Sequence, residues 1–149
     1  MPHAFVEDLA LQKATAVADK LKQGVVLGAD TVVVLGRKIL GKPRDAQDAY
    51  RMLYRLSGTT HHVYTGVALV DAGTRRTCVA HAKSSVRMKK MSLEEILKLS
   101  RQHLDKAGSY AIQEKRDPIA QVVRGSYDNV VGLPVATVKA LLKKLSRAD

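Results

Sequence analysis

The sequence has one cysteine and no long apolar run. Cys78 is the only cysteine in 149 residues, so an intrachain disulfide and any multi-cysteine zinc site are excluded, as is usual for the reducing cytoplasm. No segment approaches the ~18 apolar residues that a membrane helix needs, since the best candidate, 25–35, contains Gly28 and Asp30. The first five residues lack a basic flank followed by an apolar block, so we expect no signal peptide. These absences predict a soluble cytoplasmic protein with no membrane partner.

Aromatic residues are also scarce, whereas positive charge is abundant. Aromatic residues make up 4% of the chain, and tryptophan is missing. The 25 Lys and Arg residues against 14 Asp and Glu give a formal net charge of +11, which favours anionic partners. The cations cluster only at 87–91 and near the C-terminus. Because nucleic-acid binders usually interleave stacking aromatics with cations, solvated faces are favoured over a nucleic-acid groove, which stays open.

Length and composition predict one folded domain over residues 1–149. A chain of this length can bury its own core, and 46% hydrophobic residues is too many for a disordered chain. No repeat or linker divides the sequence, and helix-like and strand-like patterns follow one another, which predicts a mixed α/β architecture. Helices are expected at 6–22, 45–56, 92–103 and from 134 onward, and strands at 25–35, 39–40, 63–71, 77–87, 110–112 and 120–123.

A turn at 36–43 carries glycine and lysine. Residues 36–42 have the spacing of a phosphate-binding P-loop, but the next residue is Pro43, which has neither a hydroxyl for magnesium nor a backbone N–H. Residues 39–40 also favour a strand, so the P-loop interpretation is rejected. Lys42 is nevertheless a short-tethered cation that could reach a phosphate.

Asp30 stands between the apolar segments 25–27 and 32–34. A carboxylate at the end of a buried strand must be paired or bound to a metal, because desolvating it alone is costly. Asp30 therefore has either a structural role, in which it caps a turn or pairs with a lysine, or a functional role as an acid. Its spacing alone leaves both interpretations open.

Other reactive side chains give weak signals. The five histidines include no His-x-x-x-His pair, and His61 and His62 would point to opposite faces of a strand, which disfavours zinc. No serine lies in a Gly-x-Ser-x-Gly elbow. Cys78 lies within an expected strand, which favours a small core residue over a nucleophile.

Five sequence blocks occur in a specific order over nearly the whole chain. They are Gly28-Ala29-Asp30-Thr31-Val32-Val33, Ile39-Leu40-Gly41-Lys42-Pro43, the segment 52–67 with Leu56-Ser57-Gly58 and Thr65-Gly66-Val67, Lys106-Ala107-Gly108-Ser109-Tyr110-Ala111-Ile112-Gln113, and Gly125-Ser126-Tyr127-Asp128-Asn129-Val130-Val131-Gly132-Leu133-Pro134. Together they closely resemble the Maf family of nucleoside triphosphate pyrophosphatases. The resemblance implies a mixed sheet with flanking helices, related to the inosine-triphosphate pyrophosphatases, with two lobes around a cleft.

The same resemblance implies an activity and a set of site residues. It implies Mg²⁺- or Mn²⁺-dependent hydrolysis of a nucleoside triphosphate to the monophosphate and pyrophosphate. Asp30 resembles the family's essential acid, as metal ligand or water activator. Lys42 resembles its phosphate-binding lysine and Lys13 the lysine of its preceding helix, and the resemblance implies a catalytic role for both. Thr31 and Gln113 resemble the branch that acts on dTTP and UTP, with modified pyrimidine nucleotides as further candidates. A Gln amide suits this role because it can donate to and accept from a uracil or thymine edge.

The resemblance also defines what to expect before Met1 and after Gln113. The family usually begins with a Ser-x-Ser-Pro-Arg-Arg loop and a segment with a further catalytic Glu, and this chain starts beyond both, so we expect an N-terminally short Maf-like domain. Glu114 follows Gln113 where a glycine is usual. Two hypotheses remain: a pyrophosphatase, which is favoured, and a catalytically impaired Maf-like protein that binds nucleotides or RNA. The expected partner is the nucleoside triphosphate, and a homodimer stays open.

Overall fold

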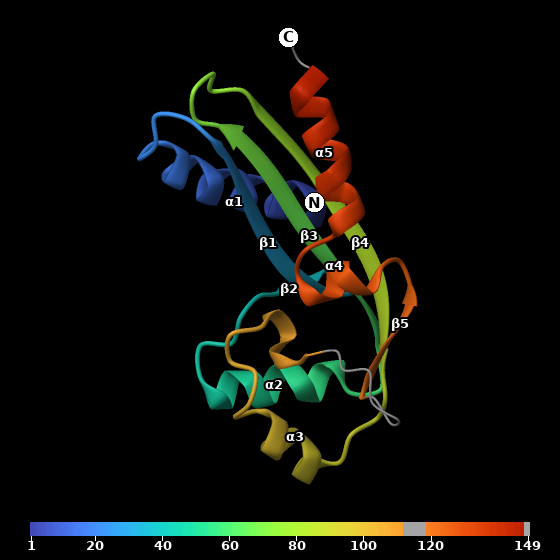
Figure 1. The fold of residues 1–149 in the computed structure, drawn as a ribbon. Coiled ribbons are helices and arrows are strands. Elements are labelled where there is room, and N and C mark those ends of the chain that lie inside the picture. The colour runs from blue at the N-terminus through green and yellow to red at the C-terminus, as the bar shows by residue number, and fades with distance from the viewer. Residues whose placement is uncertain (112–118, 148–149) are drawn as a thin grey trace.

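The structure is a computed structural model that describes residues 1–111 and 119–147 (Figure 1). Within the described residues, no helix is both long and apolar enough to cross a membrane. The elements are, in chain order, α1 (Pro2–Ala18), β1 (Val25–Leu35), β2 (Lys38–Leu40), α2 (Ala46–Leu56), β3 (Thr60–Asp71), β4 (Thr77–Met88), α3 (Leu93–Leu99), the short 3₁₀ helix η1 (Ala107–Ser109), β5 (Ala120–Arg124), α4 (Tyr127–Val131) and α5 (Val135–Arg147).

Five strands form one twisted sheet in the order β2-β1-β3-β4-β5. All four pairings are antiparallel, so the expectation of a mixed sheet is corrected for the described residues, although the α/β class with flanking helices is confirmed. The turns at 36–37 and 72–76 reverse the chain between adjacent strands, whereas a parallel pair needs a crossover of about a dozen residues or more. β2 pairs with β1 only at Val33–Leu35, which leaves the first part of β1 with β3 as its described neighbour.

Small residues bring α1 close to one face of the sheet. The buried face of α1 consists of Val6, Ala10, Ala14 and Ala18, spaced four apart so that they lie in one row. A Cβ atom added to Gly66 on β3 would lie 2.2 Å from the Val6 carbonyl oxygen. Gly28 on β1 approaches the Ala10 carbonyl in the same way, at 2.3 Å. The glycines therefore allow a backbone approach that any side chain would block.

The opposite face of the upper sheet is covered by α5, which runs along β4 in Figure 1. Leu141 and Leu145 of α5 pack on Val67, Leu69 and the buried Cys78, which fits the interpretation of this cysteine as a core residue. The molecule is thus three layers deep here, with α1 and α5 on opposite sides of the strands.

A second lobe lies below the sheet in Figure 1 and contains α2, α3 and η1. Its core joins Leu53 and Leu56 of α2 with Ile96 of α3, Tyr110 and the lower ends of the strands. α3 begins with the capping box expected at Ser92, whose side chain accepts from the Glu95 N–H. The two expected lobes are therefore present.

Several elements differ from the sequence expectation, and among them α3 ends at Leu99 instead of near residue 103. α1 spans Pro2–Ala18 instead of 6–22, because Pro2 suits the first helical turn and the chain leaves the helix after Ala18. Residues 110 and 111 form no strand, since Gly108 and Ser109 turn the chain with φ values of 71° and 62°. The helix α4 was not expected; Ser126 caps it by accepting from the Asn129 N–H, and Gly132 ends it.

Candidate functional site

A cavity of about 380 Å³ lies where the two lobes meet. Its walls come from α1, the middle of β1, the loop after β2, the η1 segment and α4. Four of the site residues suggested by sequence line it together, namely Lys13, Asp30, Thr31 and Lys42. Gln113 lies outside the described residues.

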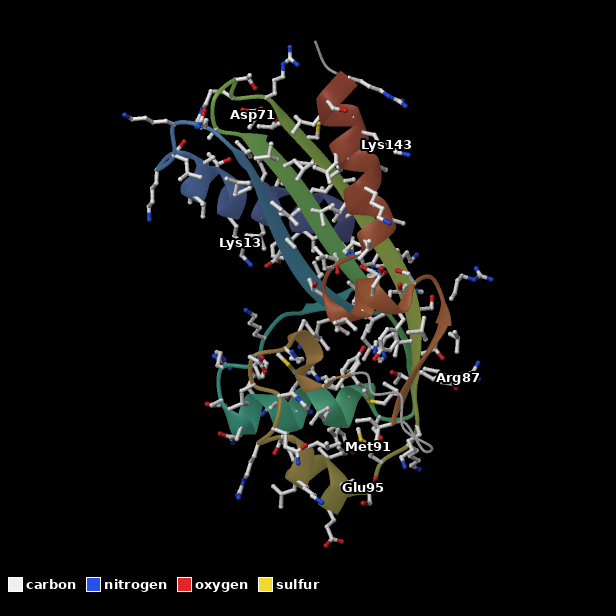
Figure 2. The ribbon with its side chains drawn as sticks, viewed as in Figure 1. Lys13, Asp71, Arg87, Met91, Glu95 and Lys143 are labelled. Atoms are coloured by element: carbon white, nitrogen blue, oxygen red, sulfur yellow. The ribbon has the colours of Figure 1, made fainter. Side chains whose placement is uncertain are left out.

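Asp30 is the acidic residue in the middle of β1. It pairs in register with Gly66, the glycine that admits the α1 backbone, so α1 passes directly over this part of the sheet. Lys13 Nζ of α1 consequently lies 2.5 Å from Asp30 Oδ1, and Figure 2 shows Lys13 projecting from α1 beside β1. The Asp30 side chain is 15% exposed and that of Lys13 54% exposed, so the pair faces the cavity with its lysine end open to solvent.

Thr31 belongs to a buried polar network that supports the cavity floor. Its hydroxyl lies 2.8 Å from the Thr65 hydroxyl, which donates to the Asn129 carbonyl at 3.0 Å. The Asn129 amide in turn donates to Val63 O at 3.2 Å and to Ser84 Oγ at 2.9 Å. Because Asn129 belongs to α4, the network fixes α4 on the sheet and with it the wall residues Tyr127, Val130 and Val131.

Asp128 fixes the other side of α4. Its carboxylate accepts from the Val135 backbone N–H at 3.1 Å, at the start of α5. Hydrogen bonds from Ser126 and then from Val135 hold the pKa of Asp128 below its usual value, so this carboxylate stays ionised. It does not line the cavity.

Lys42 enters the cavity from the loop after β2. Gly41 O accepts from the Gly108 N–H at 3.1 Å, which ties this loop to the η1 segment. Asp105 and Lys106 lie at the beginning of that segment, pair with each other at 3.5 Å, and also line the cavity. The sequence patterns did not single out these two residues as site residues, because they reach the cavity through the turn at Gly108.

Tyr110 closes the lower wall of the cavity. Its hydroxyl lies 2.8 Å from His61 Nε2. The Thr59 hydroxyl donates to Leu56 O and lies 3.3 Å from His61 Nδ1, so it can only accept from that nitrogen. His61 therefore carries its proton on Nδ1 and accepts from Tyr110 at Nε2. Burial first, and then the proximity of His62, lowers the pKa of His61 to about 4, so the ring is neutral. Burial raises the pKa of the Tyr110 hydroxyl, so it keeps its proton.

A resident metal would have few ligands from the chain. Among the described residues, no three His, Cys, Asp or Glu side chains gather into a metal-binding group. Asp30 and Asp105 are the described carboxylates on the cavity wall. Mg²⁺ is commonly held by one or two carboxylates together with waters and substrate phosphates, so this donor set fits a metal that arrives with a phosphorylated substrate.

The cavity therefore combines carboxylates with the ammonium groups of Lys13, Lys42 and Lys106. A cleft of this size with several cations on its wall is typical of a site for an anionic small molecule. The chain matches the family described as Maf-like protein over residues 1–145, and it belongs to that family.

Relatives named dTTP/UTP pyrophosphatase match most of the chain. The protein of Pelotomaculum thermopropionicum is 46% identical over 145 residues, covering 96% of this chain and 76% of that protein. The protein of Bacillus cytotoxicus is also 46% identical, covering 96% and 75%. The protein of Elusimicrobium minutum is 39% identical over 143 residues, covering 96% and 78%.

Proposed function

We propose that this chain is a single Maf-like domain that hydrolyses dTTP and UTP to the nucleoside monophosphate and pyrophosphate in the cytoplasm, with a divalent metal ion as cofactor. The observation that carries the proposal is the meeting of Lys13, Asp30 and Lys42 in one cavity, from a helix, a strand and a loop that follow one another in the chain. The relatives described above support the substrate, since they are named for dTTP and UTP.

The reaction breaks the bond between the α-phosphorus and the oxygen that bridges to the β-phosphorus. Water attacks the α-phosphorus, its proton is lost to a base, and pyrophosphate leaves with the bridging oxygen. Negative charge develops on the phosphoryl oxygens, and Lys13, Lys42 and Lys106 surround the cavity in which they would lie. Preorganised cations of this kind stabilise the transition state more than the ground state.

Asp30, with Asp105 as the further described carboxylate, would hold the metal ion. Such an ion, when bound, orients the phosphates and lowers the pKa of the attacking water. Lys13 shares Asp30 in the structure, so we propose that Lys13 turns from the carboxylate toward a phosphate when substrate binds. Both groups then exchange one charged partner for another within the same cavity.

Base selection is proposed to depend on Gln113 and on the wall around Thr31. A Gln amide can pair with N3–H and a carbonyl of uracil or thymine. The Thr31 hydroxyl is held by Thr65 and so presents a fixed surface at the cavity floor.

The test is product analysis with each common nucleoside triphosphate, with Mg²⁺ and with excess chelator. We expect UMP and pyrophosphate from UTP, and the equivalent products from dTTP, only in the presence of the metal. Orthophosphate as the first product, a preference for purines, or undiminished turnover in chelator would contradict the proposal.

A further inference from the structure

Much of the positive charge lies away from the cavity, and part of it gathers on the outer side of α2. We call this the α2 basic surface and define it by Lys38, Arg44, Tyr50, Arg51, Tyr54 and Arg55. Two adjacent grooves follow it, of about 280 and 220 Å³. Lys38, Arg44, Arg51 and Arg55 line the first groove, Tyr50 and Tyr54 line the second, and Arg51 and Arg55 belong to both.

The spacing along α2 places aromatic and cationic side chains in neighbouring rows. Tyr50 and Tyr54 are four residues apart and so share one side of the helix, as do Arg51 and Arg55. The two rows are offset by one residue. Stacking groups and phosphate-binding groups therefore alternate over one turn of helix. Although aromatics are few in the chain as a whole, two of the five tyrosines thus interleave with arginines on this helix.

Most of these side chains are exposed, whereas Tyr50 is half buried against the core of the lower lobe. Tyr54 is 61% exposed, although a tyrosine of a monomeric surface gains from being covered. Within the described residues, no ion pair or hydrogen bond engages the side chains of Lys38, Arg51 or Arg55. Among the described residues, the acid that lines the groove is Asp48, and its carboxylate is occupied by the Arg44 backbone N–H at 3.0 Å and by Arg44 Nε at 3.7 Å. The surface thus presents three unpaired cations beside an exposed ring.

We propose that the α2 basic surface binds single-stranded nucleic acid. A guanidinium group can donate two parallel hydrogen bonds to the oxygens of one phosphate. An exposed tyrosine ring stacks on an unpaired base of any identity. Duplex nucleic acid hides the faces of its bases, and an acidic peptide offers charge without stacking, so the combination selects a single strand. The groove adjoins the candidate active site, since Gly41 lines the groove and Lys42 lines the cavity. The proposal goes beyond nucleotide hydrolysis and does not depend on it.

The test uses the full chain and a fluorescent, unstructured pyrimidine oligonucleotide of about 15 nucleotides, near the upper site size of single-strand binders. Fluorescence anisotropy measures the dissociation constant over a range of salt concentrations. We expect Arg51→Ala with Arg55→Ala to weaken binding at least about tenfold and to reduce the salt slope by about 1.4, since each phosphate contact in a single strand contributes about 0.7. The matched control, Lys143→Ala with Lys144→Ala, removes the same charge from α5 and should change affinity less than about threefold.

Tyrosine variants separate stacking from charge. Tyr54→Ala should weaken binding by about tenfold, whereas Tyr54→Phe, which retains the ring, should bind as the unchanged chain does. Arg51, Arg55 and Tyr54 are all exposed. Melting temperatures measured by circular dichroism should therefore agree within a few degrees for all variants. UTP hydrolysis should be unchanged in them, because none of these residues lines the cavity.

Four results would overturn the proposal. If the α2 and α5 double variants lose equal affinity for the oligonucleotide, the oligonucleotide is attracted by the overall positive charge of the protein and not by this surface. Tighter binding of a duplex of the same length, or displacement of the oligonucleotide by polyglutamate at equal charge concentration, would assign the surface to another class of partner. Unchanged binding by Tyr54→Ala would remove the stacking on which the choice of a single strand rests. None of these results bears on the pyrophosphatase activity, which the product assay tests separately.

Discussion

Lys13 Nζ and Asp30 Oδ1 lie 2.5 Å apart, although 17 residues separate them and they belong to different elements. The ion pair depends on how closely α1 can approach the sheet, and the approach depends on Ala14, Gly28 and Gly66 rather than on the charges. Small residues between α1 and the sheet thus determine how close the lysine and the carboxylate lie at the cavity. Because Lys13 is half exposed, the pair adds at most about 1 kcal/mol to the free energy of unfolding.

Asp30→Asn separates function from stability at this pair. The substitution removes the charge at nearly constant volume, so turnover of UTP should be abolished while the melting temperature falls by only a few degrees. Turnover and thermal unfolding are measured on the same preparation, with Asp8→Asn on α1, outside the cavity, as the control. A variant that melts far lower and keeps its rate would make Asp30 a structural residue.

Lys13→Met tests whether the lysine acts on phosphate or only on Asp30. The methionine keeps an apolar stem but loses the ammonium group, so we expect the KM for UTP to rise and kcat to fall, by about tenfold or more in kcat/KM. Lys20 lies past the end of α1, so Lys20→Met should leave both KM and kcat unchanged. A change in stability without a change in kcat/KM would restrict Lys13 to neutralising Asp30.

Gly66→Ala tests the close approach of α1. The added Cβ would lie 2.2 Å from Val6 O, so α1 must shift, and we expect a loss of roughly 1–3 kcal/mol in the free energy of unfolding by urea titration. Turnover should fall too, because the shift moves Lys13 away from Asp30. Gly41→Ala is the matched control, since nothing lies within 4 Å of its added Cβ. Equal stability of the two variants would contradict this account of the α1 contact.

The sequence was sufficient for most elements, and four of the residues that the family resemblance marks, Lys13, Asp30, Thr31 and Lys42, line one cavity. Alternation and β-branched residues predicted β1, β3 and β4, and a small-residue and leucine periodicity predicted α1, α2 and α5, with errors of a few residues at the ends. These are local signals. They predict the folded structure correctly because each element also buries its apolar side against the core.

The parts that sequence could not predict depend on contacts between distant segments. Asp105 and Lys106 reach the cavity only because Gly108 bends the chain onto Gly41. The hydrogen bonds of Asn129 with Val63, Thr65 and Ser84 join α4 to two strands, β3 and β4, and no spacing along the chain indicates them. The groove on α2 needed the helix itself to place its tyrosines beside its arginines.

The last prediction concerns pH and the buried pair of His61 and Tyr110. The folded-state pKa of His61 is about 4, below the ordinary value of 6.5, so the unfolded chain binds the proton more readily between these values. Stability is therefore complete above about pH 6.5 and declines as pH falls toward about 4, by roughly 3 kcal/mol in total at 1.4 kcal/mol per pH unit.

Urea titrations at intervals from pH 7.5 to pH 4 measure that decline. His61→Gln retains a hydrogen-bonding side chain for Tyr110 but cannot titrate. Its free energy of unfolding should be lower than that of the unchanged chain at pH 7 and should change much less as the pH falls. His103→Gln, at a partly exposed position after α3, should keep the slope of the unchanged chain. The lowered pKa of Asp128 costs stability only as pH approaches and passes its ordinary value of 3.8, so it adds to the decline below about pH 5 and not to the slope above it. If the His61 variant declines as steeply as the unchanged chain, another group controls acid stability and the buried pair does not.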